Sequence, residues 1–429
     1  MACGCGAGAA AVKPLPRLDR VDRKDDAMVA NVTPRFGDAP GRASRGPVPW
    51  LAGAIVMLLA VGASPLAVRA SPPQPPPGAA TIARGMAAKN SGQYGRALAD
   101  FRHSAAAGSG RGMAWLGWSY QRGLGVAVDY ARAMKWYRKG AAAGSGLAMS
   151  NIGSLYRNGQ GVPVDYAKAV KWFRKGAAAG SGEAMCGIGT SYQNGQGLPV
   201  NYAKAMKWYR KGAAAGIGVA MCRVGQMYKN GMGVPVDHAK AMDWYRKGAA
   251  AGSGRAMVGV GRFFEHRWDY AKAMKWFRKG AAAGSGRAMA DIGFLYRFGQ
   301  SVPQDYAKAM KWFRKGAAAG SGEAMAAVGD LYAGGFGVPV DNAKEMQWYR
   351  RGAAAGSRTA MVSIAAMYDL GGAPGDHAKA VKWYRKGAAA GSKLAMQGLS
   401  FAYSVGLGVA KNPRKAAEWS AAADKAPHR

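Results

Sequence analysis

The chain has 429 residues, of which 60 are basic and 23 acidic, and its formal net charge at pH 7 is +37. Partners that carry phosphate, carboxylate or sulfate are the electrostatic expectation for such a chain. The acidic residues are too few to place a pair of catalytic carboxylates in each of the repeats that the chain contains, and its five histidines are scattered.

The first 49 residues are rich in glycine, proline and charge, with neither helical nor strand periodicity. We expect residues 1–49 to be a disordered basic leader. An uncharged apolar run then begins at Trp50, and the small residues before Ser71 resemble a cleavage site. A cleaved secretory signal over residues 50–70 is the favoured interpretation, which predicts a periplasmic or secreted protein.

Two alternatives to a cleaved signal stay open: residues 50–68 could be a retained membrane anchor, or they could be neither signal nor anchor. The true start, Met1 or Met28, is also open. Residues 71–78 read S-P-P-Q-P-P-P-G, which predicts a stiff, extended linker.

A tryptophan recurs along the rest of the chain at intervals of 32 to 36 residues. A fixed period of this length, with one helical pattern per period, predicts stacked helix pairs. We therefore expect an all-α fold, an α/α superhelical solenoid of about nine helix-turn-helix units with an N-terminal capping unit. The marker residues are Trp136, Trp172, Trp208, Trp244, Trp276, Trp312, Trp348 and Trp383.

Residues 147–182 illustrate one unit. A first helix is predicted from Leu147 to Asn158, with Gly153 inside it. A glycine in a helix costs about 1 kcal/mol relative to alanine, so its recurrence in other units indicates a close approach between helices. Glycines after Asn158 end this helix, and Asp165 is a suitable N-cap for the second helix.

In the second helix, Ala169, Trp172, Phe173, Gly176 and Ala177 share one face, which we expect to be buried. Lysines occupy the opposite face. Gly180-Ser181-Gly182 is expected to end the helix and turn the chain into the next unit.

The repeated pattern A-M-x-x-I-G-x-x-Y-x-x-G-x-G-V-x-x-D-x-x-K-A-x-x-W-Y-x-K resembles the Sel-one-like repeat, a helix-pair solenoid related to tetratricopeptide repeats. The resemblance covers residues 111–424, leaving a tail at 425–429, and residues 79–110 resemble a tetratricopeptide-like capping unit. It implies an adaptor that binds other proteins, and many bacterial members are secreted or periplasmic.

The unit at residues 255–286 departs from the pattern because it lacks the turn G-x-G-V-P-V. Phe264 is followed by Glu265-His266-Arg267-Trp268, which leads directly into Asp269. We expect a local change of superhelical curvature at this unit.

Basic residues recur at four positions of the second helix and would form a cationic ridge. Either this ridge is an ordinary solvated helix face, or it binds an anionic polysaccharide, a lipid surface or, in a cytosolic protein, nucleic acid. Its representative members are Lys168, Lys171, Arg174, Lys175, Lys204, Lys207, Lys308 and Lys311.

Three columns of the first helix, at the positions of Asn151, Ser154 and Arg157, differ from unit to unit while the packing positions barely change. In solenoids that resemble this one, first helices line the concave surface, so these columns would form a recognition groove. Neutral drift on an exposed face is the alternative. The candidate partner-binding residues are Trp115, Trp118, Asn151, Gln226, Arg223, Arg262, Phe294, Asp330 and Phe401.

No catalytic constellation or phosphate-binding loop is evident. His238 and His377 replace the tyrosine of D-Y-A-K, and His266 has no partner at a useful spacing. Cys186 and Cys222 occupy equivalent positions of neighbouring units, which suits packed thiols rather than a disulfide or a metal site. We expect no cofactor and no metal.

Together these features predict a non-catalytic, exported interaction scaffold with a concave recognition groove and a cationic convex ridge. The alternatives are a binder of anionic polymer or membrane surface and, with less support, a cell-wall-related hydrolase.

Overall fold

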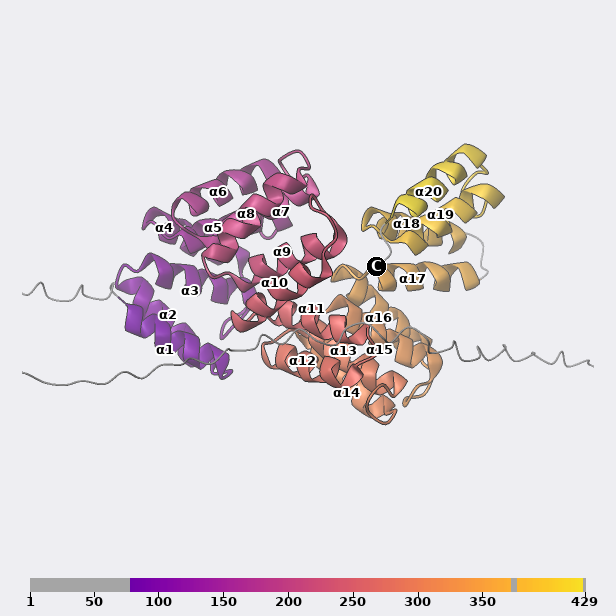
Figure 1. The fold of residues 1–429 in the computed structure, drawn as a ribbon, viewed down its shortest axis with the longest axis horizontal. Coiled ribbons are helices and arrows are strands. Elements are labelled where there is room, and N and C mark those ends of the chain that lie inside the picture. Colours follow the sequence, from indigo (N-terminus) through magenta and orange to yellow (C-terminus); the bar gives the residue numbers. More distant parts are fainter. Residues whose placement is uncertain (1–77, 372–375, 427–429) are drawn as a thin grey trace, which may run out of the picture. The chain divides into compact units, whose positions relative to one another are not determined.

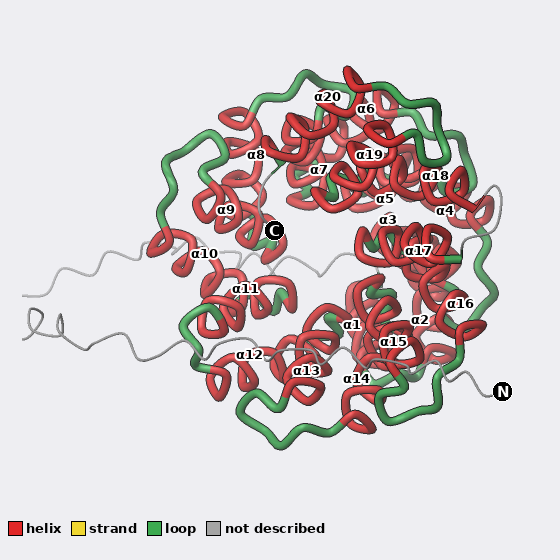
Figure 2. The backbone as a smooth tube through the Cα atoms, turned by 90° about the vertical axis from the view of Figure 1, so that its right-hand side faces the viewer, coloured by secondary structure: helices red, strands yellow, loops and turns green. Residues whose placement is uncertain are grey.

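The computed structural model describes residues 78–371 and 376–426. The predicted leader, the apolar segment 50–70 and all but the last residue of the Pro-rich linker lie outside the described residues. Every regular element within the described residues is a helix (Figure 2), and none of these helices is long and apolar enough to span a bilayer.

The helices follow one another as ten helix-turn-helix pairs, which are labelled in chain order in Figure 1. The first helices of the pairs are α1 (Ala79–Asn90), α3 (Gly110–Arg122), α5 (Gly146–Asn158), α7 (Gly182–Asn194), α9 (Gly218–Asn230), α11 (Gly254–Glu265), α13 (Gly286–Phe298), α15 (Gly322–Gly334), α17 (Arg358–Leu370) and α19 (Lys393–Val405). The second helices are α2 (Tyr94–Ala106), α4 (Tyr130–Ala142), α6 (Tyr166–Ala178), α8 (Tyr202–Ala214), α10 (His238–Ala250), α12 (Tyr270–Ala282), α14 (Tyr306–Ala318), α16 (Asn342–Ala354), α18 (Asp376–Ala389) and α20 (Pro413–Lys425).

The ends of most helices are set by residues that recur from unit to unit. Asp165 caps α6 as predicted, because its carboxylate accepts the N–H of Lys168 at 2.8 Å. Gly159 ends α5 in the left-handed conformation, with φ 66°. The serine of G-S-G does more than terminate α6, since Ser181 also caps α7 by accepting the N–H of Ala184 at 3.2 Å.

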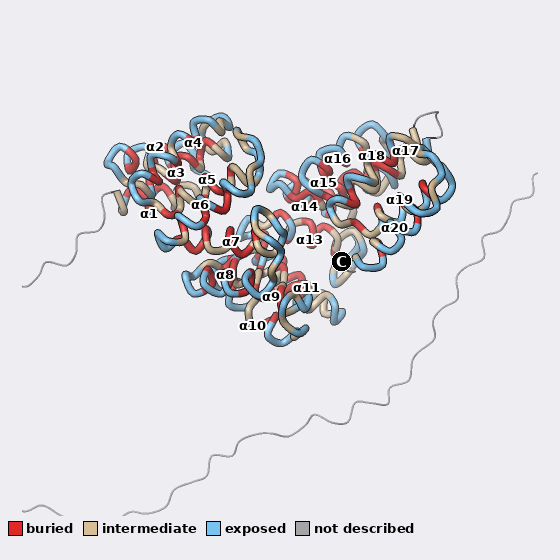
Figure 3. Tube along the Cα trace, turned by 90° about the horizontal axis from the view of Figure 1, so that it is seen from above, coloured by how far each residue is buried: buried red, intermediate tan, exposed pale blue. Residues whose placement is uncertain are grey.

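The core lies between each second helix and the first helices on either side of it, and buried residues follow these facing sides in Figure 3. Around α6 and α7 it contains Ala169, Phe173, Ala184 and Ile188. Burial of one such phenylalanine contributes about 1.5–3 kcal/mol. Trp172, predicted on the buried face, is only half-buried and packs against the cluster that extends through the preceding units and contains Ile152 and Leu155.

Two recurring glycines allow the helices to approach, as the sequence predicts for the first of them. A Cβ added to Gly153 would lie 2.7 Å from the ring of Phe173. A Cβ added to Gly176 would lie 2.8 Å from Ala184 Cβ and 3.0 Å from the carbonyl oxygen of Gly146. The aromatic ring and the neighbouring backbone therefore occupy the space that a side chain would need.

The short unit keeps its helix pair although four residues of the turn are missing. The N–H of Asp269 donates to the carbonyl oxygen of Phe264 at 3.0 Å, as the N–H of Asp165 donates to Tyr156 at 2.9 Å in the full-length unit. Trp268 adopts φ 59° to close the shorter link. The curvature change expected at this unit stays a prediction.

Substitution of Gly176 by alanine is expected to destabilise the solenoid. Overpacking costs about 1–3 kcal/mol, which exceeds the gain of up to about 1 kcal/mol in helix propensity. Gly95 provides a matched control, because a Cβ added at this helical glycine meets no atom within 4 Å. Urea denaturation should show a lower midpoint for Gly176→Ala and an unchanged or higher one for Gly95→Ala. Equal midpoints for the two variants would contradict the close approach.

The aspartate caps predict an acid-sensitive stability. The pKa of Asp165 is lowered because its carboxylate accepts the Lys168 N–H and lies 3.0 Å from Lys168 Nζ, and the pKa values of Asp237 and Asp341 are lowered in the same way. A depressed folded pKa stabilises the fold above the unfolded pKa, about 3.9, and this stability is lost as pH falls through the folded pKa.

Asn201 caps α8 with the same geometry but does not titrate, since its side-chain oxygen accepts the N–H of Lys204 at 2.8 Å. Replacing Asp165, Asp237 and Asp341 with asparagine should therefore keep the caps and reduce the loss of thermal midpoint between pH 5 and pH 2. Thermal melts across this range measure the effect, and an unchanged acid dependence would count against it.

Candidate interaction surfaces

The cationic ridge is formed by exposed side chains of the second helices. Lys168, Lys171, Arg174 and Lys175 are all exposed on α6. The same holds for Lys204 and Lys207 on α8 and for Lys308 and Lys311 on α14. The four columns of the ridge differ in the partners that their members contact.

The Lys168 column is paired with acid except at Lys204, whose cap residue is Asn201. Lys168 Nζ lies 3.0 Å from Asp165 and also lies over the ring of Tyr156, 5.8 Å from its centroid. Equivalent ion pairs join Arg132 to Asp129, Lys240 to Asp237, Lys272 to Asp269, Lys308 to Asp305, Lys344 to Asp341 and Lys379 to Asp376. This column therefore adds little net charge to the ridge.

The Lys175 column contacts the tryptophans that mark the repeat. Lys175 Nζ lies 4.8 Å from the centroid of the Trp172 ring, and the corresponding distance in the other units is between 4.0 and 4.9 Å. Such a cation–π contact holds the lysine stem on the half-buried ring while the ammonium keeps its charge.

The Arg174 column links neighbouring units. Arg210 of α8 donates to the hydroxyl of Tyr228 on α9 at 2.7 Å, and Arg385 of α18 donates to Tyr403 on α19 at 2.8 Å. The Lys171 column differs from the other three: Lys171, Lys207, Lys275 and Lys311 are exposed and form no ion pair with any described residue.

We define the first-helix face as the variable columns of the first helices, at the positions of Asn151, Ser154 and Arg157. The structure brings Arg262, Phe294 and Asp330 together on α11, α13 and α15, around a hollow of about 170 Å³ that also borders Asp291. Three of the nine predicted residues therefore share one site.

Charged pairs cross the hollow between neighbouring first helices. Arg262 donates to Asp291 at 2.8 Å, and Asp291 is only 5% exposed. Burial raises the pKa of Asp291, against the opposing effect of Arg262. Asp330 accepts from Arg297 at 3.2 Å and from the hydroxyl of Tyr349 at 2.8 Å.

The other predicted residues of this face lie elsewhere along the solenoid. Trp115 and Trp118 form an edge-to-face pair, with Lys89 Nζ 5.3 Å from the Trp118 ring centroid. Arg223 donates to Gln226 on the same helix at 3.1 Å. Asn151 is half-buried on α5, and Phe401 is exposed on α19.

Four buried polar atoms within the described residues lack a hydrogen-bond partner, and all belong to the columns of Asn151 and Ser154. They are Trp115 Nε1, Arg223 Nε, Arg262 Nε and Asp291 Oδ2. Unsatisfied buried polar groups are uncommon in folded proteins, and the side-chain atoms of this kind among the described residues lie in these two columns.

A fourth variable column also lines the hollow and was not predicted. Arg287, Glu323 and Thr359 border it, and Arg287 donates to Glu323 at 2.9 Å. These residues occupy the position of Leu147. The signal was present in the sequence, because this position also differs between units and reads Arg111, Leu147, Glu183, Val219, Arg255, Arg287, Glu323, Thr359 and Leu394.

The Sel1 repeat model matches the chain nine times. The matched ranges are 110–145, 146–181, 182–217, 218–253, 255–285, 286–321, 322–357, 359–392 and 393–423. These matches cover most of the chain, so the protein belongs to the Sel1 repeat family. The predicted family, repeat number and all-α solenoid are confirmed.

Among solved structures, the chain is similar to a protective antigen of uropathogenic Escherichia coli strains that displays an SLR fold, with 32% identity over 81% of this chain and 76% of the antigen, and a TM-score of 0.39. It is 30% identical to a Sel1 repeat protein from Oxalobacter formigenes, over 66% of this chain and 86% of that protein, with a TM-score of 0.40. It is 19% identical to an immunity protein from Pseudomonas aeruginosa, over 49% and 81%, with a TM-score of 0.41.

No curated protein matches the chain. The family supplies a scaffold fold that typically mediates protein–protein interaction. Partner identity therefore has to be inferred from the chain's own surfaces.

Proposed function

We propose that the protein is a non-catalytic scaffold that binds a protein partner on its first-helix face. The observation that supports this most strongly is that Arg262, Phe294 and Asp330, three residues that differ from unit to unit, border one hollow on this face. A partner that occupies this hollow would contact the half-buried ring of Phe294 and the charged pairs that cross the hollow.

The arrangement of the helices supports a groove on the same face. Successive first helices from α3 to α17 contact one another, as α5 contacts α3 and α7, whereas the second helices of adjacent pairs lack comparable contact. First helices that lie nearer to one another would place their shared face on the inner, concave side of the solenoid.

Export from the cytoplasm is part of the proposal, and it rests on the sequence of residues 50–70. An intact-mass measurement on the natural protein tests it. A mass that begins near Ser71 supports a cleaved signal, and the full leader on a soluble cytosolic protein would contradict export.

Truncation of the aromatic residues on the first-helix face is expected to weaken partner binding. Trp118→Ala and Phe294→Ala should each cost about 2 kcal/mol of binding free energy, because aromatic residues dominate interface hot spots. Crosslinked pull-down of the exported protein, followed by titration of the recovered partner, measures this loss.

Trp268→Ala is the matched control, because Trp268 is 79% exposed and lies in a turn outside the first helices. The partner should bind this variant as it binds the natural protein. Undiminished binding by both Trp118→Ala and Phe294→Ala would remove the first-helix face as the partner site.

A second candidate function is attachment to an anionic polymer or membrane surface through the ridge. The Lys171 column supports it, because these lysines are exposed and form no ion pair with a described residue. They repeat from one second helix to the next, which would present a row of unmatched positive charge.

Binding of dextran sulfate is expected to weaken steeply between 50 and 200 mM salt, because ion release drives such association. Replacing Lys171, Lys207, Lys275 and Lys311 with glutamine should weaken the binding and flatten its salt dependence. The paired change Asp165→Asn with Lys168→Gln conserves net charge and should have little effect. Affinity that does not vary with salt excludes the ridge as a polyanion site.

A further inference from the structure

The missing turn of the short unit exposes a surface that the turn covers in units such as those of Gly161 and Gly233. In a full-length unit the second glycine of the turn lies against the first residue of the preceding second helix. A Cβ added to Gly161 would lie 2.5 Å from Tyr130 Cβ, and one added to Gly233 would lie 2.6 Å from Tyr202 Cβ. The unit that begins at α11 has no such glycine, so the corresponding residue of α10, His238, is left uncovered.

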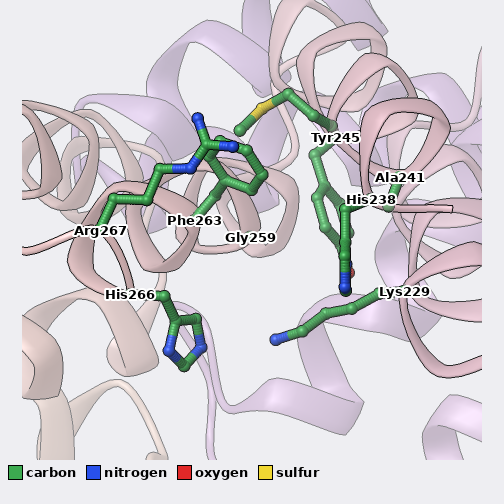
Figure 4. A pocket seen from close by; sticks show the side chains of 9 residues that line it. Lys229, His238, Ala241, Tyr245, Gly259, Phe263, His266 and Arg267 are labelled. Carbon is green, nitrogen blue, oxygen red and sulfur yellow. The ribbon is translucent and has the colours of Figure 1, made fainter. Parts of the chain in front are cut away.

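A cavity of about 330 Å³ lies where this turn would pack, between α9, α10 and α11 (Figure 4). Its walls are apolar and aromatic: Ala241, Met242 and Tyr245 come from α10, and Phe263 comes from α11. Gly259 leaves the face of Tyr245 open, because a Cβ there would lie 2.8 Å from the ring.

Apart from the hydroxyl of Tyr245, the polar side chains that line the cavity end in nitrogen. They are Lys229 of α9, His238 of α10, and His266 and Arg267 of the short link. In Figure 4 the side chains of Lys229 and His266 extend toward one another at one end of the cavity, and Arg267 lies beside Phe263, with its guanidinium carbon 4.2 Å from the ring centroid.

No carboxylate borders the cavity among the described residues. Two acids flank the short link: Asp269 is engaged with Lys272 at 2.8 Å, and Glu265 interacts electrostatically with Lys229 and Arg262. The pKa of His266 is lowered by burial and by the charges of Lys229 and Arg262. The surroundings are thus electropositive and suited to an anionic ligand.

We propose that this cavity binds an organic carboxylate attached to an apolar or aromatic group of about amino-acid size. The apolar group would lie against Met242, Tyr245 and Phe263, and the carboxylate would face Lys229, His238 and His266. Ligand sites combine an apolar enclosure with a few convergent polar groups and begin at about 300 Å³. The inference goes beyond the proposed scaffold function and does not depend on it.

The carboxylate could belong to a free acid or to the C-terminal residue of a peptide. N-acetyl-phenylalanine, its neutral amide and a heptapeptide ending in phenylalanine distinguish these sources when each is titrated calorimetrically into the natural full-length protein. The acid should bind about ten-fold or more tightly than the amide, since a charged hydrogen bond contributes about 1.5–3 kcal/mol. Tighter binding of the heptapeptide identifies a peptide C-terminus, and weaker binding identifies a free acid.

Two variants test the location. Lys229→Gln combined with Arg267→Gln should weaken binding of the acid by about ten-fold or more. Arg102→Gln combined with Lys425→Gln removes the same charge from exposed positions far along the chain and should leave the affinity unchanged.

The other variant that tests the location is a turn graft. It replaces Glu265-His266-Arg267-Trp268 with Arg-Asn-Gly-Gln-Gly-Val-Pro-Val, the eight residues at 157–164, and so restores the covering turn. The graft should abolish binding of the acid while circular dichroism shows unchanged helicity. If the graft fails to fold, the affinity of the Lys229→Gln/Arg267→Gln variant still tests the proposal. Equal affinity for acid and amide, absence of binding to the natural protein, or an unaffected Lys229→Gln/Arg267→Gln variant would overturn the proposal.

Discussion

The approach of an aromatic ring to a glycine is the contact on which the rest of the solenoid depends. Phe173 fills the space left by Gly153, and a second glycine, Gly176, lets the next helix lie against the backbone of α5. Because interiors are close-packed, these positions tolerate little change and repeat almost unaltered. The first-helix positions of Asn151, Ser154 and Arg157 are less constrained and differ between units, although some members of these columns, such as Asp291, are buried.

Much of the fold follows from local chemistry that the sequence displays directly. The period, the Asp165 cap, the Gly159 terminus and the close approach at Gly153 each depend on residues within one unit, so each could be predicted. The capping role of Ser181 was missed because the turn was interpreted only as a terminus. Trp172 was placed in the core because its spacing fits the buried face, although the cluster against which it packs extends into the preceding units.

The candidate site was less accessible to sequence reasoning, because it is made between units. Variation between the repeat units identified Arg262, Phe294 and Asp330 as candidates. Their position around one hollow depends on how successive first helices pack against one another. The partnership of Arg262 with Asp291 joins residues 29 positions apart in different units. The cavity beside His238 was equally hidden, since a deletion in one unit uncovers a residue of the preceding unit.

The junction between α10 and α11 also bears on how the array opens. In a stack whose units contact only their neighbours, the stability is approximately the sum of the unit stabilities and of the interfaces between adjacent units. Cooperative unfolding therefore depends on each interface. At this junction the covering turn is missing, and Phe264 stands where Tyr228 and Tyr403 offer a hydroxyl to an arginine of the preceding unit. Separation of the solenoid at this junction would divide it into two blocks, one that ends with α10 and one that begins with α11.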